Sequence, residues 1–98
     1  MMNREELITR IMDDLSCKRE IAEFHADSIE KLPDDLKDQL FRYLETGVIP
    51  DISSSGVSLH DILSKGNISI YSAFSYLHFF SLKPEMADTF LKTTFYIK

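Results

Sequence analysis

The chain has 98 residues, which is enough for one domain with a modest core. Hydrophobic residues make up 44% of it, which excludes a disordered chain, and the net charge of −5 argues against a phosphate-binding surface. The single cysteine, Cys17, excludes an internal disulfide, so we expect a reducing compartment and a cytoplasmic location.

The charge is uneven along the chain. Residues 1–47 hold seven Lys or Arg and twelve Asp or Glu, whereas residues 48–98 hold four of each kind. The longest apolar stretch, residues 68–82, is shorter than the roughly 20 residues of a membrane span and is interrupted by serines and His78. We therefore expect an acidic helical first half, no signal peptide and no membrane span.

The first acidic segment begins with a capping pattern. Asn3 is a good helix N-cap, and Glu6 stands at the capping-box position. Apolar residues then recur at helical spacing through residue 15 and again over residues 21–32. Two arrangements fit this pattern. One is a single long helix, and the other is two helices with Ser16 capping the second. We favour two segments or one bent helix, because Lys18 and His25 interrupt the heptad-like apolar seam that a single long helix would have.

A further helix is predicted after Pro33, which suits a first helical turn, and Gly47 is a natural stop. Residues 48–57 contain Pro50, three serines and Gly56, and this composition predicts a loop. The acidic helices thus occupy residues 3–46. The loop is interpreted as a connection within a single domain, residues 1–98.

Aromatic-rich helices are predicted over residues 58–95. Ser58 caps a short helix that ends at Gly66, and Asn67 or Ser69 caps the most apolar segment, which closes before Pro84. As a helix, this segment would have apolar side chains on almost every side, which is typical of a buried central helix. The tail, residues 93–97, has a strand-like composition, but a lone strand has no partner, so a helix or an irregular tail is favoured.

Aromatic residues concentrate in the last third of the chain, where eight of the eleven lie. Two short flanking helices cannot cover all of them, and a symmetric homodimer is the commonest way to bury such a surplus. Aromatic side chains are also enriched in interface cores. The candidate interaction residues are Tyr71, Tyr76, Phe79, Phe80, Phe95 and Tyr96.

Catalytic and cofactor chemistry finds little support. His25, His60 and His78 lack metal-ligand spacing, and the three isolated glycines cannot form a phosphate loop, so we expect no metal and no cofactor. Cys17 precedes two basic residues and would gain reactivity if Ser16 capped a helix. This thiol is one alternative function.

A helix-turn-helix cadence over residues 59–77 is the other alternative. A recognition helix must present side chains to bases and phosphates, yet residues 66–82 contain no Lys or Arg, so nucleic acid is disfavoured as a partner. We therefore predict an all-α fold, a compact irregular bundle of five to six short helices. Its expected function is that of a non-catalytic protein-interaction or regulatory domain that associates with itself.

Overall fold

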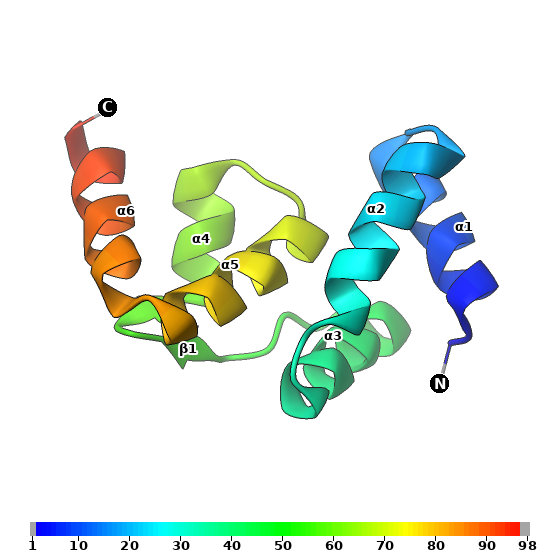
Figure 1. Ribbon diagram of the computed structural model, residues 1–98, viewed down its shortest axis with the longest axis horizontal. Coiled ribbons are helices and arrows are strands. Elements are labelled where there is room, and N and C mark those ends of the chain that lie inside the picture. The colour runs from blue at the N-terminus through cyan, green and yellow to red at the C-terminus, as the bar shows by residue number, and fades with distance from the viewer. Residues whose placement is uncertain (1, 97–98) are drawn as a thin grey trace. The chain divides into compact units, whose positions relative to one another are not determined.

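The computed structural model describes residues 2–96, and it describes side chains as far as residue 92. Within these residues it has six helices and one two-stranded sheet, which confirms the predicted all-α fold (Figure 1). Contacts divide the chain into two compact units, Met1–Gly47 and Val48–Lys98. The boundary falls where the predicted loop begins. The single-domain organisation stays a prediction.

The first unit consists of α1 (Arg4–Leu15), α2 (Arg19–Glu30) and α3 (Asp34–Thr46). The favoured prediction of two segments is therefore confirmed, and the single long helix is excluded. Ser16 adopts the left-handed conformation at φ 49° and ends α1, and Lys18 is the N-cap of α2. The prediction that Ser16 caps the second helix is wrong, because a left-handed residue terminates a helix and cannot start one.

The core of the first unit lies between α1 and α2, which pack against each other. Ile8 and Ile11 of α1 are fully buried, as are Ala22 and Ala26 of α2. The alanines are one helical turn apart, so the larger side chains of α1 can approach the backbone of α2 closely. Burial of these apolar groups provides the main stabilisation of the unit.

A small hairpin stands inside the predicted loop. Strand β1 (Ser53–Ser54) pairs antiparallel with β2 (Val57–Ser58). Ser55 and Gly56 between them have φ of 53° and 83°, which is the pattern of a type I′ hairpin turn. The Ser55 hydroxyl donates a hydrogen bond of 2.9 Å to the carbonyl of Phe80, close to the end of the aromatic-rich helix Ile70–Leu82.

The rest of the second unit comprises α4 (Leu59–Gly66), α5 (Ile70–Leu82) and α6 (Pro84–Tyr96). Ser58 caps α4 with its hydroxyl, as the sequence predicted, and of the two candidates Ser69 caps α5, while Asn67 ends α4. Helix α5 contacts α4, α6 and β1, so it is the central helix of its unit. The tail through residue 96 is helical, and Ile97 lies outside the described residues.

Candidate interaction surfaces

The six predicted interaction residues fall into three groups. Tyr71 and Phe80 are only 1% and 2% exposed and belong to the core of the second unit. Tyr76 and Phe79 are exposed. The side chains of Phe95 and Tyr96 lie outside the described residues. Sequence reasoning could not separate these groups, because α5 is apolar on almost every side.

Aromatic rings connect α5 to α6. The Phe80 ring centroid lies 5.6 Å from that of Phe90 and 5.9 Å from that of Tyr76. Phe79 adds a further ring 6.1 Å from Phe80. These separations are typical of favourable aromatic pairs. The buried ring of Phe80 thus holds the two exposed rings of α5 in place.

Two more large apolar side chains extend this surface. Leu82, three residues after Phe79, is 68% exposed, and Met86 in the first turn of α6 is also exposed. We call Tyr76, Phe79, Leu82 and Met86 the α5–α6 apolar face. Single exposed apolar residues are ordinary, whereas interaction sites are found where exposed apolar residues gather in larger patches.

Charged side chains flank the α5–α6 apolar face. Exposed Lys83 and Glu85 lie in sequence between Leu82 and Met86, and Asp88 and Lys92 form an ion pair of 3.0 Å on α6. The second unit carries no net charge, because its four basic residues balance its four acidic ones. The net charge of −5 therefore resides in the first unit, and the second unit adds no net charge to the repulsion between two copies.

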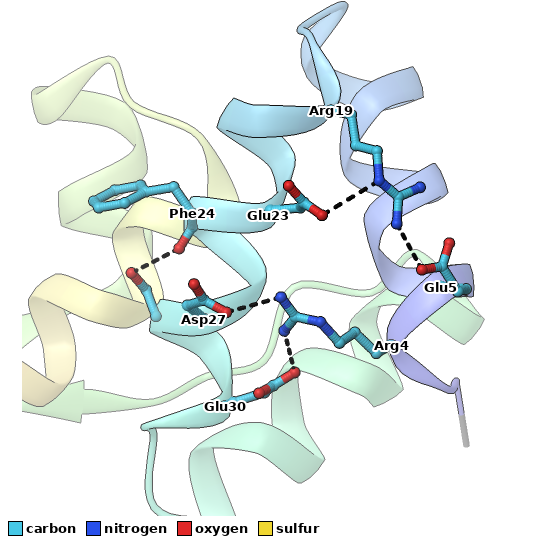
Figure 2. Close-up of polar contacts among 8 residues, drawn as sticks. Arg4, Glu5, Arg19, Glu23, Phe24, Asp27 and Glu30 are labelled. Carbon is cyan, nitrogen blue, oxygen red and sulfur yellow. Dashed lines mark hydrogen bonds and ion pairs between the residues drawn. The ribbon is translucent and has the colours of Figure 1, made fainter.

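The first unit has a smaller apolar patch that the sequence analysis missed. Ile21 and Phe24 of α2 are 50% and 68% exposed, although their spacing matches a buried helical face. Figure 2 shows the Phe24 ring on the side of α2 away from Arg4 and Arg19. The small residues Ala22 and Ala26 occupy the buried side instead. The recurrence of apolar residues over 21–32 therefore did not indicate which of them face α1.

Two arginines form ion pairs between α1 and α2 (Figure 2). Arg4 pairs with Glu30 at 2.5 Å and with Asp27 at 2.9 Å, and both hydrogen bonds raise its pKa, with that to Glu30 contributing most. Arg19 donates to Glu5 at 2.6 Å and holds the pKa of that carboxyl below its ordinary value. These groups are solvent-exposed, so they orient the helices more than they stabilise them.

A cavity of about 410 Å³ opens at one end of the first unit, among the start of α1, the end of α2 and the first turns of α3. Leu7 and Ile29, both almost fully buried, and half-buried Phe41 form its apolar lining. Its charged lining includes Arg4, Lys37 and Asp38. The size is that of a site for a small molecule or a single large side chain.

One of the two features behind the thiol alternative is absent from the structure. Cys17 lies before the N-cap of α2, outside the helix, and its sulfur is 4.0 Å from the carbonyl oxygen of Ile11. The expected position in a first helical turn is therefore wrong, because α2 begins later than the capping pattern of Ser16 predicted. The activity of this thiol stays untested.

The helix-turn-helix cadence corresponds to α4 and α5, joined by residues 67–69. The exposed side of α5 carries Tyr76, Phe79 and Leu82, with no basic side chain among residues 66–82. Phosphate contacts need such side chains. The alternative of DNA binding is untested, and this surface gives it no support.

Among the described residues, no group of three His, Cys, Asp or Glu side chains is placed to hold a metal ion. None of the described helices is both long and apolar enough to span a bilayer. Comparisons of the chain with models of protein families, with curated proteins and with solved structures give no match.

Proposed function

We propose that the chain is a non-catalytic interaction domain that binds through the α5–α6 apolar face, and that its first partner is a second copy of itself. One observation carries this proposal: Tyr76, Phe79, Leu82 and Met86 are all exposed along α5 and the start of α6. Burying such a run against a partner releases the free energy of removing apolar surface from water.

A second copy suits this surface for two reasons. In a symmetric dimer the same face meets itself, so apolar side chains cover apolar side chains. Lys83 of one copy and Glu85 of the other carry opposite charges beside that face, and opposite charges across an interface favour the correct pairing. The proposal includes a cytoplasmic location, because Cys17 has no partner for an internal disulfide.

Sedimentation velocity tests the proposal, with Leu82→Glu as the variant and Phe24→Glu as its matched control. Leu82 and Phe24 are both helical and both 68% exposed, so the two substitutions add the same charge at equal exposure. The wild-type chain should pass from monomer to dimer between low micromolar and near-millimolar concentration. Leu82→Glu should stay monomeric, whereas Phe24→Glu should associate like the wild type.

Two outcomes contradict the proposal. A wild-type chain that is monomeric throughout this range excludes self-association. A dimer that Leu82→Glu leaves intact places the contact elsewhere. Circular dichroism of both variants provides the folding control, since an exposed side chain contributes little to the stability of the monomer.

A further inference from the structure

The cavity of the first unit combines an apolar lining with one free carboxylate. Leu7 and Ile29 are 2% and 1% exposed, so the inner wall of the cavity is apolar. Phe41 adds an aromatic ring, and Asp38 stands three residues before it on the same side of α3. A ligand along Phe41 can therefore reach the carboxylate of Asp38 with one of its ends.

Each positive charge of the cavity has an acidic partner. Arg4 pairs with both Asp27 and Glu30. Lys37 lies 3.5 Å from Asp34. Among the described contacts Asp38 makes no ion pair, so it is the uncompensated charge of the lining. The first unit as a whole also carries five more negative than positive groups, which attracts cations toward it.

From this arrangement we infer a binding site for an amphipathic cation. The ligand is an ammonium or guanidinium group on an apolar stem, either a free small amine or the side chain of a basic peptide. The stem lies against Leu7 and Ile29, while the cation reaches Asp38 and the face of the Phe41 ring, which attracts cations as well. This site does not depend on the α5–α6 apolar face.

A titration followed by amide NMR tests the inference with three probes of one shape. Phenethylammonium carries the cation, 2-phenylethanol replaces it with a neutral hydroxyl, and 3-phenylpropionate replaces it with an anion. Phenethylammonium should shift the amides of Leu7, Ile29 and Phe41 and bind more tightly than the other two. Equal binding of the alcohol, tighter binding of the anion, or shifts that avoid these amides would each overturn the inference.

The variant Asp38→Asn isolates the charge, and Asp35→Asn is its matched control. Both aspartates are exposed on α3, and both substitutions change the net charge equally, but only Asp38 lines the cavity. Asp38→Asn should weaken phenethylammonium binding about three- to fivefold, the usual effect of losing one exposed ion pair. Asp35→Asn should leave it unchanged. Equal effects of the two variants would show general attraction and no site.

A fourth probe distinguishes the two sources of the cation. The dipeptide Phe-Lys, acetylated and amidated at its ends, presents the same apolar and cationic groups within a peptide. Tighter binding than phenethylammonium supports the site as one for a basic side chain of another protein. Weaker binding supports it as one for a free amine.

Discussion

Phe79 and Phe80 are neighbours on α5, so the same substitution at each compares an exposed ring with a buried one. Phe80 is 2% exposed, and replacing a buried Phe with Ala costs about 3–5 kcal/mol, since a cavity adds to the lost apolar burial. Phe79 is 37% exposed, so nearly two thirds of its surface is covered. Full burial of a Phe contributes about 1.5–3 kcal/mol, which gives about 1–2 kcal/mol for Phe79→Ala.

Urea unfolding followed by circular dichroism measures this difference at a concentration where the chain is monomeric. With a slope of about 1 kcal/mol per molar urea for a chain of this size, the two midpoints should differ by about 2 M. If Phe80→Ala is unfolded without urea, Phe80→Leu provides a milder loss at the same position. Equal midpoints for the two alanine variants, or a lower one for Phe79→Ala, would refute the assignment of Phe80 to the core.

Three further predictions concern local features. Asn3→Ala removes the side chain that accepts a hydrogen bond of 2.9 Å from the backbone N–H of Glu6, and should cost about 1 kcal/mol in a urea titration. Gly56→Ala meets no atom within 4 Å, but it places a side chain at φ +83°, so thermal unfolding should show a loss of about 1 kcal/mol from backbone strain alone. Burial lowers the pKa of His25, and Arg19 lowers that of Glu5. The folded state therefore binds protons less readily than the unfolded chain, so stability should fall as the pH drops through the range of His25 and then of Glu5. His25→Gln should remove the first of these two losses, and an unchanged profile would show that burial of His25 has no effect.

Local sequence signals predicted the helices well. Asn3, Ser58 and Ser69 have hydroxyl or amide oxygens that satisfy helix N–H groups, and each occupies the cap that its position indicated. Such signals depend on residues a few positions apart. The hairpin turn at Ser55 and Gly56 is also local, but three neighbouring serines resemble an irregular loop more than a strand.

The surfaces were harder to predict because they depend on packing between helices. Phe24 is one of several apolar residues over 21–32, yet the small side chains of Ala22 and Ala26 lie on the side of α2 that is buried. On α5 an almost uniform apolar surface gives no periodic signal that separates Phe79 from Phe80. The cavity combines residues from three helices, among them Leu7 and Phe41, and no spacing along the chain indicates it.

The hydrogen bond from Ser55 to the carbonyl of Phe80 has a consequence for the order of folding. It joins residues 25 positions apart, so it forms only when the hairpin turn and the end of α5 both exist. We expect this long-range bond to form after the rate-limiting step, and interactions of that kind change the unfolding rate and leave the folding rate almost unaltered. We therefore expect Ser55→Ala to shorten the lifetime of the native state without slowing its formation.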